Sequence, residues 1–222
     1  LALNNKEMKT MIKISRKNPS LIHVNYIDLF NLAIEKLKKL INNLESAEFK
    51  IITSAKSKPY ISPMLDLSPH FIAISIILLK QMPEYVLVEK KKIYGTFKDK
   101  SKRQMVSLNL LFKNKIIKIL AGNGSKIKER SGKFITKNKI FYYDNSSTGK
   151  NLLRYIVNRK IPSTKKIKLK KTPSLTSSIY FFLKNVRLKK KHTRDLYLSE
   201  KILKVLLAAE KSLKSRNLEK VK

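Results

Sequence analysis

A long basic stretch without acidic residues constrains this chain more than any other feature of its sequence. Between Asp144 and Asp195 there is no Asp or Glu, while 15 Lys and Arg residues fall in the same interval. The whole chain of 222 residues has a formal net charge of +35, and self-repulsion of that size destabilises a compact molecule that is free in solution. We therefore expect a polyanionic partner, and nucleic acid offers closely spaced phosphates for this purpose.

The composition narrows the class of protein further. Apolar residues make up 42% of the chain, so we expect a folded core and not wholesale disorder. Lys greatly outnumbers Arg, and Ile and Asn are abundant, which is the bias of AT-rich codons. There is no cysteine, which excludes disulfides and thiol nucleophiles. The longest apolar run, Phe71 to Leu79, is much shorter than the ~20 residues of a membrane span, and Leu1 to Lys13 does not look like a signal peptide.

The first part of the chain, residues 1–105, is predicted to be an N-terminal α+β extension. Apolar residues spaced three and four apart predict one long helix, with a stripe formed by Ile27, Phe30, Ile34, Leu37, Ile41 and Leu44. Phe71 to Leu79 is either a buried strand or a short helix, and Tyr85 to Val88 is typical of a strand. The charged segment from Asp99 to Met105 is a plausible boundary to the second part.

The second part, residues 106–222, is predicted to be a mainly α domain with a protruding basic β-hairpin at about 165–187. Apolar residues from Val106 to Leu120 favour a helix that ends at the glycines 122 and 124. Two alternating runs on either side of Thr172 to Ser174 favour the hairpin. A last helix carries Leu198, Ile202, Val205, Ala209 and Leu213 on one face. Phe134 to Tyr143 is ambiguous between strand and helix.

The sequence shows no pattern of catalytic residues. His23, His70 and His192 lie far apart and without a neighbour at metal-ligand spacing, so we expect them to be structural or exposed. The segment from Gly122 to Lys126 lacks the spacing of a phosphate-binding loop. We therefore expect no catalytic residue, no metal and no cofactor, and interpret the chain as a binding protein that is not an enzyme.

Basic residues interleaved with aromatic ones predict contact with RNA, since aromatic rings can stack on unpaired bases. An Arg that persists where the codon bias favours Lys indicates a need for its planar, bidentate guanidinium. The candidate RNA-binding residues are Lys126, Lys128, Arg154, Arg159, Lys165, Lys166, Lys168, Lys170, Lys171, Tyr180, Lys184, Arg187, Lys189, Lys190, Lys191 and Arg194.

Short motifs of the second part resemble the universal small-subunit ribosomal protein seven family. In that family an apolar helix ends at a basic Gly-containing turn, a basic strand follows, and a Ser-Thr-Tyr strand and Val-Arg precede a helix with Ala-Ala. The corresponding residues here are Ala121 to Lys126, Ile161 to Thr164, Ser178 to Tyr180, Val186-Arg187 and Leu206 to Ala209. Residues 1–105 have no counterpart in that family.

The resemblance implies a structural constituent of the small ribosomal subunit that binds rRNA in the head and lines the exit-site path of tRNA and mRNA. Its partners would be rRNA and neighbouring ribosomal proteins, and with the codon bias it implies a mitochondrial location. The cytoplasm of an organism with an AT-rich genome is the alternative. Other open readings are another organellar ribosomal or ribonucleoprotein subunit, including one of the large subunit, a basic RNA-processing enzyme, and a peripheral membrane protein.

Overall fold

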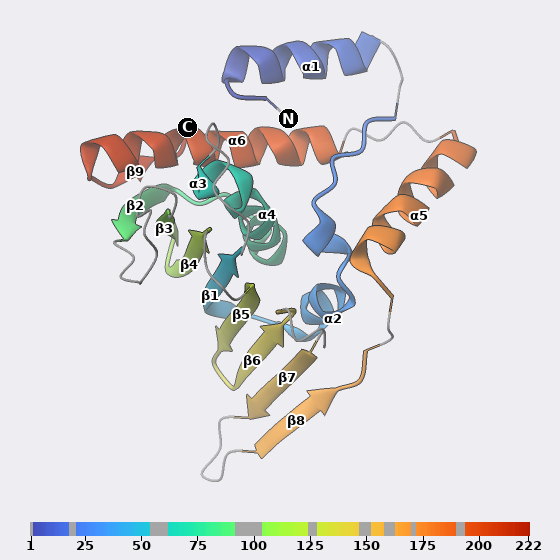
Figure 1. Ribbon diagram of the computed structural model, residues 1–222, viewed down its shortest axis with the longest axis vertical. Helices are drawn as coiled ribbons and strands as arrows, with labels where there is room; N and C mark the ends of the chain where they lie inside the picture. Colours follow the sequence, from blue (N-terminus) through green and yellow to red (C-terminus); the bar gives the residue numbers. More distant parts are fainter. Residues whose placement is uncertain are drawn as a thin grey trace, which may run out of the picture.

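The computed structural model describes residues 2–17, 21–53, 62–91, 104–123, 128–146, 152–157, 163–169, 172–189 and 194–222. A nine-stranded mixed sheet forms its centre, and helices pack on it (Figure 1). The strands are β1 (Leu44–Ile52), β2 (Tyr85–Lys91), β3 (Met105–Phe112), β4 (Lys115–Gly122), β5 (Glu129–Thr136), β6 (Lys139–Asp144), β7 (Leu152–Val157), β8 (Ser163–Ile167) and β9 (Glu219–Lys220). The helices are α1 (Asn5–Lys17), η1 (Ile27–Phe30), α2 (Leu32–Leu40), α3 (Pro63–Asp66), α4 (Ser68–Leu79), α5 (Ser174–Arg187) and α6 (Arg194–Ser215).

Strand β1 lies in the middle of the sheet and joins two antiparallel halves. The strand order is β8-β7-β6-β5-β1-β4-β3-β2-β9. β1 pairs in parallel with β4, where Phe49 lies opposite Ile119, and antiparallel with β5, where Phe49 lies opposite Gly132. The other neighbouring strands pair antiparallel. The described strands therefore do not form the parallel sheet of a doubly wound α/β fold.

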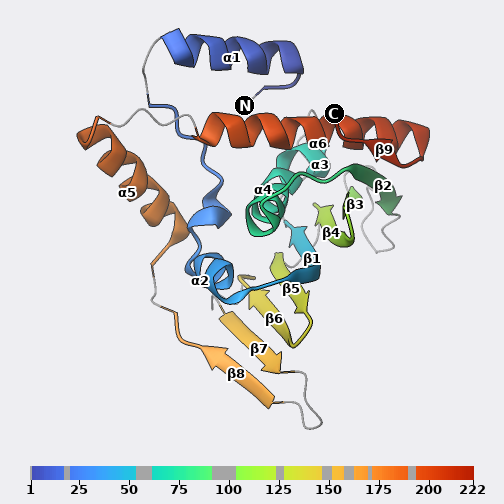
Figure 2. The same ribbon diagram turned by 180° about the vertical axis from the view of Figure 1, so that it is seen from behind.

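The core lies between the sheet and α4, and stacked aromatic rings form its centre. The ring centroids of Phe49 on β1 and Phe71 on α4 are 4.5 Å apart, and Phe134 on β5 meets Phe49 edge-on at 5.2 Å. Gly132 leaves room for these rings, because a Cβ atom there would lie 3.0 Å from Phe134 Cε2. All of α4 from Phe71 to Ile76 is buried, with helices on one side and strands on the other (Figures 1 and 2).

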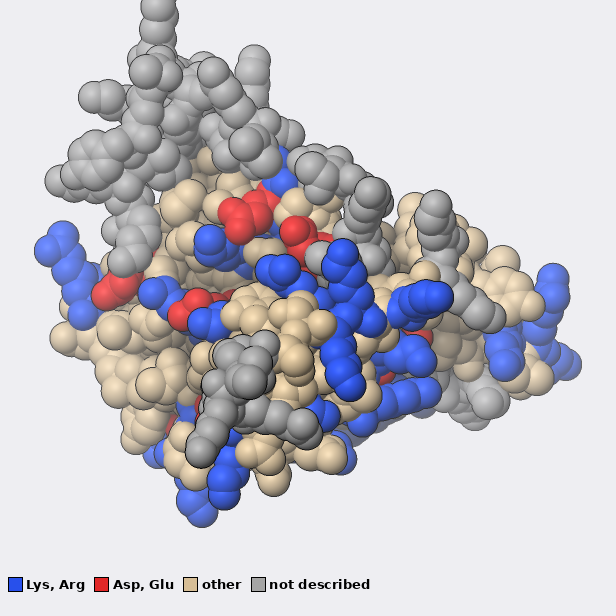
Figure 3. All heavy atoms as spheres, turned by 90° about the horizontal axis from the view of Figure 1, so that it is seen from below, with Lys and Arg blue, Asp and Glu red and all other residues tan. Residues whose placement is uncertain are grey.

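The two faces of the sheet differ because side chains alternate along each strand. On β1, Ala47, Phe49 and Ile51 are buried on the helix side, whereas Glu48 and Lys50 between them are exposed. Seen from the bottom of Figure 1, Lys and Arg side chains spread over much of the surface, with Asp and Glu side chains in between (Figure 3). The positive charge is therefore dispersed over this view and does not gather on one ribbon.

The prediction of a mainly α domain with a protruding hairpin is wrong. Instead of one helix, Val106 to Leu120 forms the hairpin of β3 and β4. Val106, Leu108, Leu110 and Phe112 are buried at every second position, which is the period of a strand. The apolar residues of this segment also fit the period of a helix, but the segment pairs as two strands.

The predicted hairpin at 165–187 is also wrong. Its first run is a strand, β8, but β8 pairs with β7, and its second run is helix α5. Within α5, the buried Ser178 and Asn185 and the half-buried Phe181 and Phe182 recur at spacings of three and four residues. This helical period outweighs the short alternation of aliphatic and aromatic residues that suggested a strand.

The long helix predicted over Ile27 to Leu44 is interrupted. It consists of η1 and α2, which begins after Asn31, and Leu44 already belongs to β1. The Asn31 side chain accepts a hydrogen bond from the amide of Ala33, so it caps α2. In contrast, the strand at Tyr85 to Val88 and the last helix are confirmed as β2 and α6, and Phe71 to Leu79 is helical.

Strands from both sides of the boundary at residue 105 pair in the same sheet. β2 is hydrogen-bonded to β3, and β1 to both β4 and β5. The last strand, β9, pairs with β2 and so returns the end of the described chain to the first part. Residues 1–105 therefore contribute strands to the same sheet as residues 106–222.

We expect Phe49→Ala to destabilise the fold by about 3–5 kcal/mol, because it removes the ring that contacts both Phe71 and Phe134. Urea denaturation followed by circular dichroism would measure the change. Ile116→Ala is the matched control, because Ile116 is on the neighbouring strand but 54% exposed. A loss at Phe49 no larger than that at Ile116 would contradict the proposed core.

Candidate functional site

The fold buries one acidic side chain among the described residues, that of Asp28, which is 2% exposed. Asp28 Oδ2 lies 3.1 Å from His70 Nδ1, and its Oδ1 lies 3.4 Å from Arg130 Nη1. We call Asp28, His70 and Arg130 the Asp28 cluster. Because a buried carboxylate loses its hydration, it needs such charged or hydrogen-bonding neighbours to remain ionised.

Three separate elements position the cluster. Asp28 is in η1, and His70 is in the first turn of α4, directly after Pro69. Arg130 is on β5 at even spacing from Gly132 and Phe134, so it points to the helix-covered side of the sheet. The sequence separations are large, so the cluster exists only once the sheet and helices have packed.

The orientation of His70 is suited to proton exchange. Its Nδ1 atom is buried beside Asp28 without making an aligned hydrogen bond, whereas 21% of the side chain is exposed. The exposed surface therefore lies on side-chain atoms other than Nδ1. A carboxylate beside Nδ1 favours a proton on that nitrogen, which leaves Nε2 to accept or donate a proton to a ligand.

Two tyrosines complete the surroundings of the cluster. Tyr143 on β6 is almost fully buried, and the side-chain amide of Asn31 donates a hydrogen bond of 3.3 Å to the Tyr143 hydroxyl. Burial raises the pKa of Tyr143 well above its ordinary value, and the charge of Asp28 raises it further. Tyr26 meets the His70 ring edge-on at 6.4 Å, and burial also raises its pKa. Both phenols therefore stay protonated at neutral pH.

A second polar chain has the connectivity of a catalytic triad but a structural role. His23 Nδ1 lies 2.7 Å from Asp195 Oδ2, and His23 Nε2 lies 2.9 Å from Ser178 Oγ. However, Ser178 is 1% exposed, and its hydroxyl donates a 2.8 Å hydrogen bond to Asn25 Oδ1. A nucleophile must reach its substrate with a free lone pair. These hydrogen bonds instead hold the segment before η1 against α5 and α6.

Those of the predicted RNA-binding residues that the structure describes are spread over several strands and helices. Arg154 is on β7, where its guanidinium stacks at 5.2 Å from the Tyr142 ring, and Lys165 and Lys166 are on β8. Lys128 and Lys168 lie beside strands β5 and β8. The others that are described lie on or beside α5 and α6, namely Tyr180, Lys184, Arg187, Lys189 and Arg194. Lys126, Arg159, Lys170, Lys171, Lys190 and Lys191 lie outside the described residues.

Sequence reasoning missed the Asp28 cluster. The sequence predicts only that His70 is structural or exposed, and it does not indicate Asp28 as its partner. One signal was present, since Asp28 is flanked by Ile27, Leu29 and Phe30, and an acid within an apolar stripe demands a partner. The identity of the partners could not be read from the chain, because they come from α4 and β5.

Within the described residues, no helix is long and apolar enough to cross a membrane. In the same part of the chain, no group of three or more His, Asp or Glu side chains could hold a metal ion.

Comparison with known proteins identifies the fold through structure alone. No protein-family model matches the sequence, and no curated protein matches it. A UDP-N-acetylglucosamine 3-dehydrogenase from Acidithiobacillus ferrooxidans matches with a TM-score of 0.78 at 17% identity, over 96% of this chain and 68% of that chain. A protein of Desulfitobacterium hafniense described as an NADPH-dependent oxidoreductase matches with 0.80 at 13%, over 99% and 70%. An aldose–aldose oxidoreductase from Caulobacter crescentus, complexed with glycerol, matches with 0.78 at 11%, over 97% and 68%.

These neighbours overturn the resemblance to the ribosomal protein seven family. That family implied a mostly helical domain, whereas this chain shares the mixed-sheet fold of oxidoreductases. The predictions of a small-subunit constituent, of a role in translation, and of rRNA, tRNA, mRNA and ribosomal proteins as partners are therefore wrong, and an RNA-processing enzyme has no support. The expectation that the chain is not an enzyme is contradicted by the same neighbours. The described residues of the short motifs that suggested the family lie on or beside β4, β8, α5 and α6 of another fold.

The described residues do not fit a nicotinamide dinucleotide. Such a cofactor binds where a parallel strand turns through glycines into the N-terminus of a helix. Strands β1 and β4 are the parallel pair, but β4 is followed by β5, and the sequence between β1 and α3 contains no glycine. Gly122 and Gly124 are not followed by a third glycine at position 127, which is Ile127.

We expect Asp28→Asn to lower the free energy of unfolding by about 3 kcal/mol, because it leaves His70 and Arg130 without their buried counter-charge. Urea denaturation would measure the loss. Glu48→Gln removes an exposed acid from the other face of the sheet and should change the stability by less than about 0.5 kcal/mol. Equal effects of the two substitutions would refute a structural role of the cluster.

Tyr143→Phe should flatten the loss of stability at alkaline pH. In the unfolded chain the phenol ionises with its ordinary pKa of 10.0, whereas the folded protein raises that pKa. Above pH 10.0 and below the raised pKa of the folded protein, the unfolded state loses a proton that the folded state keeps. In this range Tyr143 makes the free energy of unfolding fall by about 1.4 kcal/mol per pH unit. Comparing urea midpoints of the two proteins from neutral pH to about pH 11 would reveal the difference. Parallel curves would show that Tyr143 ionises freely in the fold.

Proposed function

We propose that this chain forms the substrate side of an oxidoreductase for hydroxylated, sugar-like molecules, in which His70 exchanges the hydroxyl proton. The observation that carries the proposal is the Asp28–His70 pair, with Nδ1 held at 3.1 Å from the carboxylate while 21% of the His70 side chain is exposed. The neighbours support it, since their names include a dehydrogenase of a sugar nucleotide and an aldose–aldose oxidoreductase complexed with glycerol.

The chemistry needs a group of this kind. When an alcohol is oxidised to a carbonyl, it loses a hydride and a proton. The hydride would pass to an acceptor that the described residues do not supply, and the hydroxyl proton must pass to a base within hydrogen-bond reach. The reverse reaction needs an acid at the same place. His70 Nε2 performs both tasks if Asp28 keeps the proton on Nδ1. Arg130 does not need to touch the substrate, because its contact with the other oxygen of Asp28 serves to orient the carboxylate.

Imidazole proton signals would test the proposal directly. The chain has three histidines, so each Cε1 proton can be assigned in the NMR spectrum by single His→Gln substitutions. Titration with UDP-N-acetylglucosamine, glucose and glycerol should shift the His70 signal in a saturable way. Asp28→Asn should weaken this binding by roughly ten-fold, because the ring loses the partner that sets its orientation and tautomer.

The His23 signal is the internal control, because His23 is held between Asp195 and Ser178 and is not a member of the Asp28 cluster. It should stay unchanged while His70 responds. If none of the three compounds moves the His70 signal, or if His23 moves in parallel, the proposed substrate class is wrong.

A further inference from the structure

A cavity of about 380 Å³ is lined by residues of η1, α2, α4, α5 and α6. Its volume is within the range of small-molecule sites. Its wall is formed largely by apolar side chains, namely Leu29, Phe30, Ile77, Phe181 and Leu198. The Asp28 cluster is not part of this lining, so the cavity is a site distinct from the proposed proton-exchange site.

Three cations converge on the cavity from three different helices. Lys38 comes from α2, Lys184 from α5 and Arg194 from the start of α6. Among the described residues, none of the three has a carboxylate oxygen within ion-pair distance. The lining also contains Glu35 and Asp195, but Asp195 is already bound by His23 and the Val24 amide.

The surroundings of Lys38 disfavour the charged form of its amine. Burial lowers its pKa, and the nearby Arg194 lowers it further, although Glu35 partly opposes both effects. A desolvated ammonium beside a second cation stays charged at a cost, which an anion bound between them would offset. The three cations and the apolar wall therefore favour a ligand that has both an anionic group and an apolar body.

We propose that this cavity binds a small amphipathic anion, in which one carboxylate, sulfonate or phosphate is attached to an aromatic or aliphatic body. The acidic group lies among Lys38, Lys184 and Arg194, and the apolar body lies against Phe30, Phe181 and Leu198. The site is independent of the proposed sugar-like substrate, which needs hydroxyl groups near His70.

Two fluorescent probes of similar shape test the charge requirement on the full chain. Anilinonaphthalene sulfonate carries the anionic group, and N-phenylnaphthylamine is its uncharged counterpart. Both should bind saturably. The double variant Lys38→Met with Arg194→Met should weaken the sulfonate by roughly ten-fold or more, since it removes two charge-assisted contacts, and should leave the neutral probe within about three-fold.

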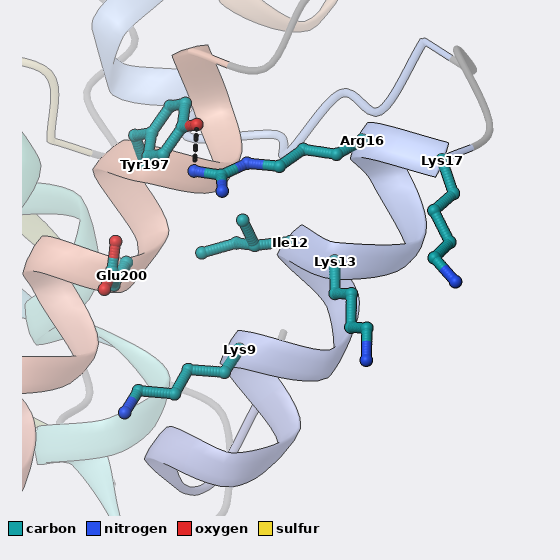
Figure 4. A pocket seen from close by; sticks show the side chains of 7 residues that line it. All are labelled: Lys9, Ile12, Lys13, Arg16, Lys17, Tyr197 and Glu200. Carbon is teal, nitrogen blue, oxygen red and sulfur yellow. Dashed lines mark hydrogen bonds between the residues drawn. The ribbon is translucent and has the colours of Figure 1, made fainter.

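The control variant removes the same amount of charge elsewhere. Lys13 and Lys17 on α1 border a groove between α1 and α6, where Arg16 reaches Tyr197 while both lysines extend away from α6 (Figure 4). Lys13→Met with Lys17→Met should leave both probes unaffected. Equal weakening of the sulfonate by the two double variants would overturn the proposal, because it would reflect net charge alone.

A third variant places the probes in the cavity. Ser177 lines it from α5, and Ser177→Trp should block both probes because the indole fills the space. Unfolding curves that match the original protein would show that each variant is folded. If Ser177→Trp leaves both affinities unchanged, the probes bind elsewhere and the cavity is not the site.

Discussion

Strand β1, at the centre of the sheet, holds its two halves together. Among the described strands, β1 alone bonds to both antiparallel halves of the sheet, in parallel on one side and antiparallel on the other. Its Phe49 ring connects this junction to α4 and β5, so hydrogen bonding and side-chain packing meet at one residue. Moving β1 by one residue would turn Phe49 to the exposed face, so its register fixes where both halves lie.

The candidate site depends on β1 indirectly, through the strand and the helix that contact it. Arg130 is on the strand that pairs with β1, and His70 is on the helix that packs against it, so the register of β1 sets the distance between them. Burying Asp28 between the two disfavours the carboxylate's charge unless both partners are in place. The proposed proton exchange rests on this same Asp28–His70 pair.

The sequence predicted the elements whose period was unambiguous. The last helix followed from a stripe over four turns, and the strand at Tyr85 to Val88 from its apolar run before charged residues. It failed at Val106 to Leu120 and Ser174 to Arg187, where apolar residues satisfy both the helical and the strand period and tertiary pairing decides. The Asp28 cluster could not be predicted, since its three members are joined only by packing. The high lysine content suggested a nucleic-acid partner, but AT-rich codons favour lysine whatever the protein binds.

The lysines of strand β8 have a consequence for how the edge of the sheet meets other molecules. It is an edge strand of the sheet, and its residues from Ser163 to Lys166 are exposed, including Lys165 and Lys166. An open edge presents unpaired amides and carbonyls on which another copy could add a strand, and charged side chains prevent such addition by mutual repulsion. The charge that suggested a polyanionic partner thus also keeps neighbouring molecules from joining edge to edge, and so protects the solubility of a sheet this wide.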